Sequence, residues 1–262
     1  MLRAFSTSAT GMAAQQMMVD VTANNLANMN TTGFKRSQVN FQDLLYVKMR
    51  ESGTEISSGM KSPNGLEVGS GVRAANTVKV FDAGEMVNTT RSLDVAIAGD
   101  GFLQVTMPDG TTKYTRDGAL MKGANGELLT SSGYFITPSI TIPTDAVAVN
   151  IGQDGGVNVT TASGTQSVVG TITLARFANP SGLSNEGENL LAETEASGTA
   201  TTGTPGTNGY GIIQSGFLEK SNVQMITELV NLITAQRGYE TSSRSIRAGD
   251  EMLRKAIEIA RF

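Results

Sequence analysis

Apolar residues recur at alternating intervals of three and four positions at both ends of the chain, and this spacing constrains the fold more than any other feature. The first series is Leu2, Phe5, Ala9, Met12, Gln16, Val19, Ala23 and Leu26. The second is Met225, Glu228, Leu232, Ala235, Tyr239, Ser242, Ile246, Gly249, Leu253, Ala256 and Ala260. This spacing is typical of a coiled-coil seam rather than of the broader stripe of a surface helix. We therefore predict a long helix at each terminus, and we expect the two to pair.

The polar residues and helix ends refine this prediction. Gln16 and Glu228 interrupt the seams, so neither is expected to face a helix partner. Gly33 is predicted to end the first helix, with Phe34 as an anchor beyond it. The second helix is apolar on more than one side near Val230, where a further set of apolar residues adds a second face. That set is Ile226, Leu229, Val230 and Ile233.

Between the helices the pattern changes to short alternating segments. Leu93, Val95 and Ile97 are expected on one face of a strand, and Val147, Val149 and Ile151 on one face of another. Pairs such as Asp117-Gly118 and Asn125-Gly126 mark turns between them.

The predicted fold is therefore α+β, with an antiparallel β-rich domain inserted between the terminal helices. Residues 1–45 and 215–262 form a discontinuous helical domain, residues 46–71 an extended linking segment, and residues 72–214 the β domain, with a Gly/Thr-rich loop at 196–211.

The composition limits the chemistry. The chain has no Cys and no His, which excludes disulfides and thiolate or imidazole metal sites. A net charge of −4 disfavours nucleic acid as a partner. We predict no cofactor, no metal and no small-molecule substrate. No apolar run is long enough to span a bilayer, and the N-terminal residues lack the apolar stretch of a cleaved signal peptide.

An enzyme and an adhesin are the alternatives from other classes. The chain has scattered carboxylates that could pair as in a glycosidase: Asp94, Asp100, Asp109, Asp117 and Asp154. All but Asp94 precede a glycine, which is typical of turns, so no catalytic residue is predicted. A secreted adhesin with paired helical tails would form a discrete oligomer instead of a filament.

Two open seams indicate association with further copies, because one pairing cannot bury them fully. An interface whose rotation does not close generates a helical filament. Asn24, Asn25 and Asn28 are neighbours on the first helix, and mispaired amides beside a seam cost about 1–3 kcal/mol. We therefore hypothesise that these amides fix the register between subunits.

Three motifs resemble those of the bacterial flagellar axial proteins, the family of rod, hook and hook-associated subunits. They are "ANNLANMNTTGFKR", "SLDVAIAGDGFLQV" followed by "YTRDGAL", and "GFLEKSNVQMITELVNLITAQRGYETSSRSIRAGDEML". The segment "FQDLLYVKMRESG" followed by "GLEVGSGVRAANTVKVFDAGEM" resembles that of the distal rod members, and another rod or hook subunit is the alternative within the family.

The resemblance implies a non-enzymatic subunit of a hollow helical tube that acts as a drive shaft. It implies export by the flagellar type III apparatus without signal cleavage, and a place in the basal body across the periplasm. The implied partners are further copies, proximal rod subunits, the hook protein, and the L and P rings. The implied subunit-interface residues are Leu2, Phe5, Met12, Val19, Asn24, Asn25, Leu26, Asn28, Gly33 and Phe34 in the first helix region, and Met225, Ile226, Leu229, Val230, Leu232, Ile233, Tyr239, Ile246, Leu253 and Ile257 in the second.

Overall fold

The structure is a computed structural model that describes residues 2–53, 55–57, 60–61 and 63–259. The chain forms two compact units. The helical unit contains residues 1–26, 37–78 and 225–262, and the β unit contains residues 27–36 and 79–224. The side chain of Leu2 and all of Ala260, both in the predicted seams, lie outside the described part.

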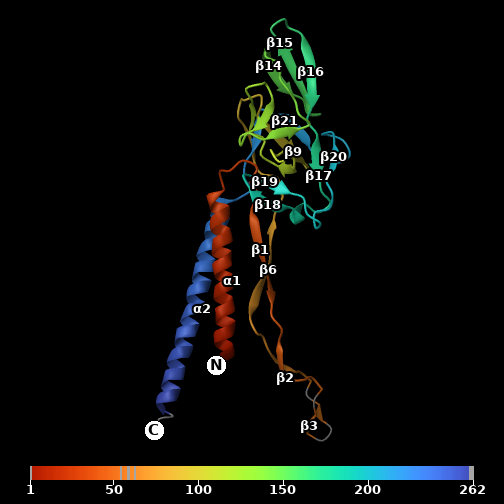
Figure 1. Cartoon of the computed structure of the whole chain (residues 1–262). Helices are drawn as coiled ribbons and strands as arrows, with labels where there is room; N and C mark the ends of the chain where they lie inside the picture. The colour runs from red at the N-terminus through yellow and green to blue at the C-terminus, as the bar shows by residue number, and fades with distance from the viewer. Residues whose placement is uncertain (1, 54, 58–59, 62, 260–262) are drawn as a thin grey trace. The chain divides into compact units, whose positions relative to one another are not determined.

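The helical unit is built on α1 (Leu2–Ala27) and α2 (Met225–Ile259), which lie side by side (Figure 1). A Cβ atom on Gly249 would lie 2.8 Å from the Phe5 ring, and one on Gly238 would lie 2.9 Å from the Gln15 side chain. Residue numbers therefore increase along α1 in the direction in which they decrease along α2, so the two helices are antiparallel. The predicted pairing of the terminal helices is confirmed.

Helix α1 ends at Ala27, so the predicted end at Gly33 is wrong. Asn28 follows the last helical residue, and it accepts hydrogen bonds from Thr31 at both its backbone oxygen and its side-chain oxygen. Side-chain amides compete with the helical backbone in this way. Gly33 instead lies in a later turn with φ of +66°. A Cβ atom there would come within 2.6 Å of the Arg116 carbonyl carbon.

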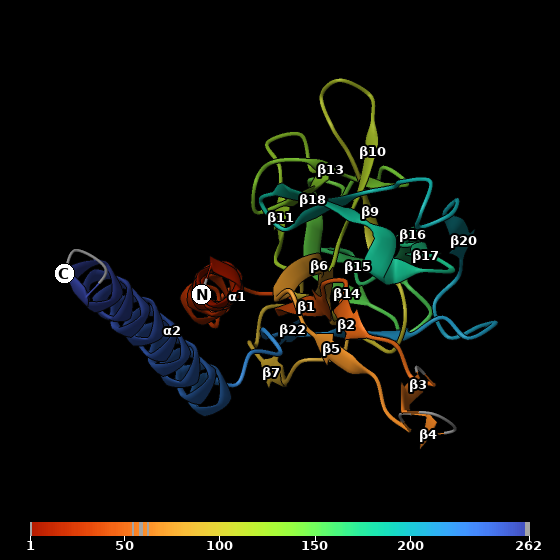
Figure 2. The ribbon, with the colours of Figure 1, turned by 90° about the horizontal axis from the view of Figure 1, so that it is seen from below.

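The rest of the helical unit is an arm of successive strand pairs, drawn in orange in Figures 1 and 2. The pairs are β1 (Ser37–Asp43) with β6 (Val72–Lys79), β2 (Val47–Arg50) with β5 (Leu66–Val68), and β3 (Glu55–Ser57) with β4 (Met60–Lys61). Large apolar side chains are exposed along the arm, among them Leu45 at 91%, Tyr46 and Met49. Such a surface is typical of an interaction site.

The β unit contains a nine-stranded antiparallel sheet. Its strands are β9 (Phe102–Thr106), β10 (Thr112–Thr115), β11 (Leu120–Lys122), β12 (Leu128–Thr130), β13 (Phe135–Thr137), β17 (Leu174–Arg176), β18 (Ser184–Gly187), β19 (Leu190–Ala192) and β20 (Thr201–Gly203). A short 3-10 helix, η1 (Pro180–Gly182), follows β17. The predicted loop at 196–211 contains β20 as well as turns.

Smaller sheets complete the β unit. A three-stranded sheet contains β14 (Ala146–Ile151), β15 (Gly156–Thr161) and β16 (Gln166–Thr171), and two pairs join β8 (Val95–Ala98) to β21 (Ile212–Ser215) and β7 (Met86–Asn88) to β22 (Phe217–Glu219).

The alternation predicted for β14 is partly wrong. Ile151 is buried and Val149 half-buried, but Val147 is exposed. The register shifts between Ala146 and Ala148, so Val147 is the extra residue of a β-bulge and turns away from the core face.

Two apolar clusters form the core of the β unit. The larger one includes Val95, Ile97 and Leu103, and the smaller one is aromatic, with Phe102, Tyr114 and Phe177.

Asp109, Asp117 and Asp154 each accept a hydrogen bond from the backbone N–H two residues later, as the turn interpretation of the Asp-Gly pairs predicts. Neither α1 nor α2, over the residues described, has an apolar stretch that could span a membrane.

Candidate functional site

The face of α2 that packs on α1 follows the predicted C-terminal seam. Ala235 and Gly249 are buried, and Leu232, Ile246 and Leu253 are half-buried. Small residues bring the helices close together, because the Phe5 ring and the Gln15 side chain occupy the space above Gly249 and Gly238. The predicted seam is therefore the contact surface between the two helices of one protomer.

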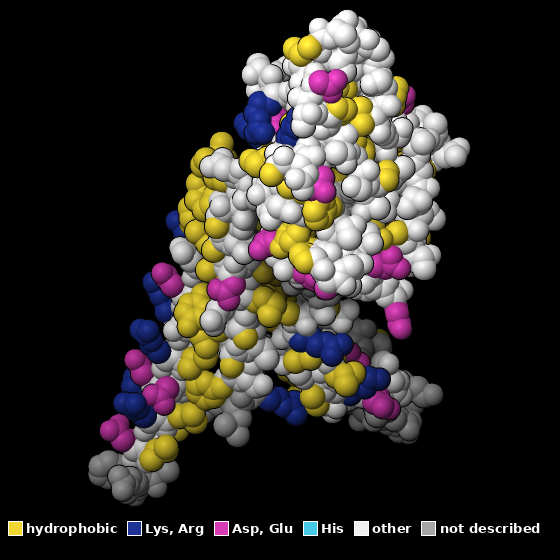
Figure 3. Space-filling model, turned by 45° about the horizontal axis from the view of Figure 1, so that its top comes forward, with side chains coloured by type: hydrophobic (Ala, Val, Ile, Leu, Met, Phe, Trp, Pro, Cys, Tyr) yellow, Lys and Arg dark blue, Asp and Glu magenta, His cyan; other side chains and the backbone are white. Residues whose placement is uncertain are grey.

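The opposite face of α2 is apolar only near its start. At about 100° per residue, Ile226, Leu229, Val230 and Ile233 point away from the α1-facing seam. All four are exposed, Ile226 by 79% and Val230 by 56%. The same face carries charged residues further along, such as Arg244 and Glu251. Figure 3 shows the apolar side chains along the helices and the mixed charges toward the C-terminal end of α2. We call the four residues the outer apolar patch.

The remaining predicted C-terminal interface residues are also exposed: Met225, Tyr239 and Ile257.

The predicted seam of α1 lies to one side of the contact with α2. Phe5, Met12, Val19 and Leu26 are half-buried, whereas Gln16 is exposed. An open groove of about 510 Å³ runs along this side of the helix pair and is lined by Gln16, Val19, Gln236, Tyr239 and Glu240. The groove leaves part of the predicted seam uncovered within the protomer.

Asn25 has an intrachain role that the sequence did not predict. Its side chain accepts a hydrogen bond from the Ser37 N–H at 2.8 Å and donates one to the Ser37 carbonyl oxygen, also at 2.8 Å. It also contacts the Glu228 carboxylate at 3.4 Å. Asn25 thereby ties the end of α1 to the start of β1 and to α2. The amide is buried, while Asn24 is exposed and Asn28 half-buried.

The expectation that Glu228 does not face a helix partner is wrong. Glu228 is only 3% exposed, on the seam that faces α1. The polar partner supplied by Asn25 makes this burial tolerable, because a buried carboxylate is costly only when its hydrogen-bonding capacity is unmet. Gln16, the other polar residue of the seams, is exposed as expected.

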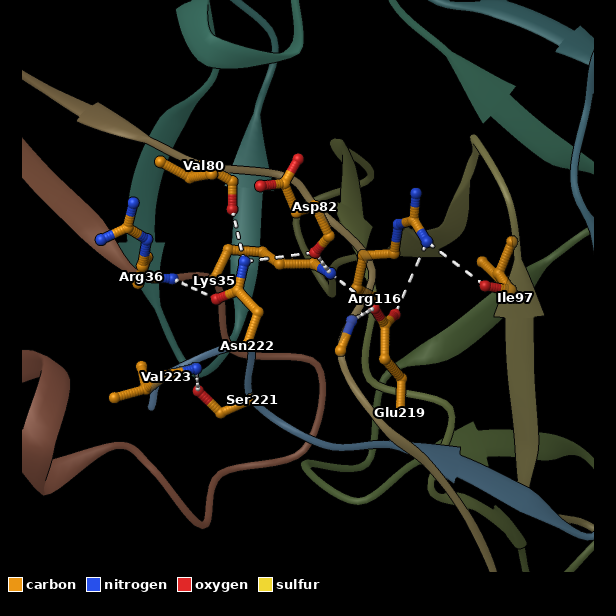
Figure 4. Close-up of polar contacts among 11 residues, drawn as sticks. Lys35, Arg36, Val80, Asp82, Ile97, Arg116, Glu219, Ser221, Asn222 and Val223 are labelled. Atoms are coloured by element: carbon orange, nitrogen blue, oxygen red, sulfur yellow. Dashed lines mark hydrogen bonds and ion pairs between the residues drawn. The ribbon is translucent and has the colours of Figure 1, made fainter. Parts of the chain in front are cut away.

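The β unit contains a buried ion cluster formed by Lys35, Arg116 and Glu219 (Figure 4). Lys35 Nζ lies 2.5 Å from Glu219 Oε1 and donates a second hydrogen bond to the Asp82 carbonyl oxygen. Glu219 Oε1 also accepts the Gly84 N–H. Arg116 Nη1 lies 3.5 Å from Glu219 Oε2. Burial lowers the pKa of both Lys35 and Arg116, and the Glu219 carboxylate opposes that effect in each case.

The cluster joins segments far apart in the sequence. Lys35 follows the turn after α1, Arg116 follows β10, and Glu219 ends β22. Beside it, Asn222 accepts the Arg36 N–H and donates to the carbonyl oxygens of Val80 and Asp82. The cluster and Asn222 hold together the three segments through which the chain enters and leaves the β unit, and tie them to Arg116 inside it.

Sequence reasoning missed this cluster. Each of its members stands in one of the quoted motifs, in "TGFKR", "YTRDGAL" and "GFLEKSN". Lys35 and Glu219 each follow a large apolar residue directly, which is the only local sign that their side chains are buried. No spacing rule pairs charges more than 100 residues apart.

Gly33 and Phe34 belong to this region too. Gly33 is buried and donates its N–H to the Glu219 carbonyl oxygen at 2.8 Å. The Phe34 ring lies 5.1 Å from Lys79 Nζ. Both residues were predicted at a subunit interface, and in the protomer they pack within the β unit.

Three protein families match the chain in sequence order. The family described as flagella basal body rod protein matches residues 5–35. The D1 domain of the flagellar hook protein FlgE/F/G matches residues 96–159. The C-terminal part of the flagellar basal body rod FlgEFG proteins matches residues 214–259. These matches include most of α1, strands β9 to β13 of the nine-stranded sheet, and all of α2.

Full-length relatives are similar over almost the whole chain. The flagellar basal-body rod protein FlgG of Buchnera aphidicola subsp. Schizaphis graminum is 47% identical over 96% of this chain and 97% of its own length. The FlgG proteins of Borreliella burgdorferi and Bacillus subtilis are 43% and 37% identical, each over the full length of both chains.

Proposed function

The chain belongs to the FlgG family of flagellar basal-body rod proteins, and we propose that it forms the distal part of the rod as a hollow helical tube of identical subunits. It is a structural, non-enzymatic rod subunit located in the basal body. The observation that supports assembly into a tube is the outer apolar patch of α2.

The outer apolar patch supports assembly because α1 already covers the opposite face of α2. Burying a Val, Leu or Ile side chain contributes about 1.5–3 kcal/mol. Four such residues left exposed on one helix face are therefore a strong drive for contact with another helix. The groove beside Gln16 and Tyr239 offers a second uncovered surface on the same helix pair. Two distinct surfaces on one protomer favour head-to-tail association, which extends into a filament.

The tube has partners at both ends and around it in this proposal. Proximal rod subunits lie below, the hook protein above, and the L and P rings around the outside. The tube transmits torque to the hook, and later axial subunits pass through its channel after export by the type III apparatus. In this proposal α1 and α2 form the wall of the channel, and their predicted interface residues contact neighbouring subunits.

The outer apolar patch is tested by replacing Val230 and Ile233 with Glu in one variant. We expect this variant to remain monomeric at concentrations where the parent forms tubes. Losing two buried apolar side chains raises the dissociation constant between neighbouring subunits by about a hundredfold or more. Sedimentation at increasing protein concentration and electron microscopy measure the outcome.

The matched control replaces Thr241 and Ser245 with Glu. These exposed positions lie on the same helix away from the patch, so the added charge is equal and tubes should form. Tubes from the Val230 and Ile233 variant would refute the assembly surface. A discrete oligomer from the parent at every concentration would favour the adhesin.

The arm is proposed to brace neighbouring subunits, because it carries large exposed apolar side chains, Leu45 at 91%, Tyr46 at 53% and Met49 at 64%. Removing residues 51–65, the end of the arm beyond β2 and β5, should give tubes that bend more than parental tubes while export continues. Persistence length in electron micrographs measures the bending, and secreted protein measures export. Straight tubes after this deletion would rule out bracing.

A further inference from the structure

The exposed methionines lie mainly on the surfaces through which the subunits are proposed to assemble. Among the residues that the structure describes, five methionines are exposed by 41% to 64%: Met17, Met49, Met121, Met225 and Met252. The backbone of a helix or strand contributes little accessible surface, so exposed fractions of this size belong to the thioether side chains. Because the chain has no Cys, these thioethers are the only sulfur groups that an oxidant can reach.

Met225 borders the outer apolar patch. It is the first residue of α2 and stands four positions before Leu229, so the two side chains are neighbours on the helix surface. Both are exposed. The four residues of the patch are aliphatic and have no side-chain hydrogen-bond donor. Any contact that covers the patch therefore also covers Met225, and a polar group at this position would find no partner within the patch.

Met49 has the same relation to the arm. The register of β2 against β5 shifts between Lys48 and Arg50, so Met49 is the extra residue of a β-bulge. It is exposed together with Val47 and Leu66. A neighbouring subunit that covers the apolar residues of the arm also covers the Met49 thioether.

Met17 stands beside the groove of the helix pair. It follows Gln16, which lines the groove, and it is the only large apolar side chain exposed on the described part of α1. The other two exposed methionines lie elsewhere, Met121 on β11 in the β unit and Met252 on the charged C-terminal part of α2. Patch, groove and arm thus each have one exposed methionine, and two more serve as internal references.

Oxidation changes a thioether in a way that an apolar contact does not tolerate. A hydroperoxide transfers one oxygen to the sulfur: the S–O bond forms as the O–O bond breaks, and the sulfur loses two electrons. The proton of the transferred oxygen passes to the departing oxygen, which leaves as water or an alcohol. The sulfoxide that results is polar and accepts hydrogen bonds. Burying such an acceptor without a donor raises the dissociation constant of a contact by about tenfold to a hundredfold.

We propose that Met17, Met49 and Met225 are modification sites for a hydroperoxide in the unassembled subunit, and that their sulfoxides prevent the assembly described under the proposed function. Assembled tubes cover these thioethers and protect them. The modification therefore acts on subunits before they join a tube, and enzymes that reduce methionine sulfoxide reverse it.

The test treats the full-length monomeric chain with hydrogen peroxide, locates the sulfoxides by peptide mass spectrometry, and measures the lowest protein concentration at which tubes sediment. We expect sulfoxides at all three sites and at least a tenfold increase in that concentration. Reduction by the two classes of methionine sulfoxide reductase should restore the value of the untreated chain. Tubes that form at an unchanged concentration from chains oxidised at all three sites overturn the proposal.

Two variants locate the effect. Leucine keeps the apolar volume of methionine but has no sulfur to oxidise. The combined variant Met17→Leu, Met49→Leu and Met225→Leu should form tubes at the parental concentration both before and after peroxide. The matched control, Met121→Leu with Met252→Leu, should remain as sensitive to peroxide as the parent. A sensitive first variant or a resistant control would show that the effect arises outside the assembly surfaces, and either result overturns the proposal.

Tubes provide a second readout. The three methionines should be oxidised at least tenfold more slowly in tubes than in monomers, because neighbouring subunits cover them, and equal rates in both states would overturn the proposal. Failure of the proposed function has a different signature. An untreated parent that forms no tubes at any concentration contradicts assembly itself and the role of the methionines with it, whereas tubes indifferent to oxidation contradict the role of the methionines alone.

Discussion

Replacing Glu219 with Gln is expected to lower the free energy of unfolding of the β unit by about 3–5 kcal/mol. Glu219 is 1% exposed and is the carboxylate that both Lys35 and Arg116 contact. The substitution keeps the shape of the side chain but leaves two buried cations without a counter-charge. Chemical denaturation followed by the far-UV signal of the β-rich region measures the change.

The control for this prediction is Glu186→Gln. Glu186 pairs with Lys113 at 2.7 Å, but its side chain is 42% exposed, so the loss should stay below about 1 kcal/mol. Equal losses for the two variants would mean that burial of the ion cluster does not matter for stability.

The Glu219→Gln deficit should depend on pH in a defined direction. Burial already lowers the pKa of Lys35 below its ordinary value of 10.5, and losing the carboxylate lowers it further. Between that folded pKa and 10.5 the unfolded state binds more protons, so the free energy of unfolding rises with pH. The difference in free energy of unfolding between the parent and the Glu219→Gln variant should therefore become smaller as the pH increases from 7 toward 10. A deficit that widens over this range would contradict the assignment of Lys35.

Replacing Gly118 with Ala is expected to prevent stable folding of the β unit, at a cost of more than about 4 kcal/mol. A Cβ atom at this position would lie 1.7 Å from the Val95 carbonyl oxygen. Strand β8 is held there by the Val95 N–H, which donates to the Gly118 carbonyl oxygen at 3.0 Å. Relief of the clash requires moving β8, whose residues Val95, Ala96 and Ile97 are buried. Circular dichroism and soluble yield report the loss.

Gly133→Asn is the matched control in the same unit. Gly133 has φ of +87°, and a Cβ atom there would meet no other atom within 4 Å. Asn adopts this left-handed conformation more readily than most residues, so the loss should be about 1 kcal/mol. A folded Gly118→Ala variant as stable as this control would show that β8 can shift without loss.

Much of the helical unit could be predicted because its signals are periodic and local. The seam through Leu232, Ala235 and Ile246 specifies which face of α2 meets another helix. The outer apolar patch follows from the same periodicity. The seam of α1 was less informative, because α1 also contacts the arm, where Thr10 Oγ1 accepts the Val72 N–H at 3.4 Å. When a helix packs against two neighbours, the spacing of its apolar residues alone does not show which face contacts α2 and which contacts the arm.

The errors concern residues whose positions depend on specific contacts, some of them local and some with distant parts of the chain. Glu228 is buried because Asn25 reaches it from 203 residues away, and α1 ends early because the Asn28 amide accepts from Thr31. Val147 leaves its predicted face because of a bulge opposite Thr160 and Thr161. Local periodicity cannot encode these contacts. The ion cluster was missed for the same reason, since its members are brought together only by the folded β unit.

The ring of Phe5 above Gly249 has a mechanical consequence. If α1 slid along α2 by one heptad, the ring would meet Ser242 or Ala256, where a Cβ atom occupies the space that glycine leaves empty. At the other end of α1, the hydrogen bond from Asn25 to Glu228 would be lost. The Phe5–Gly249 and Asn25–Glu228 contacts therefore fix the axial register of α1 and α2 within each protomer. An axial force applied to one helix is transmitted to the other without a change in register.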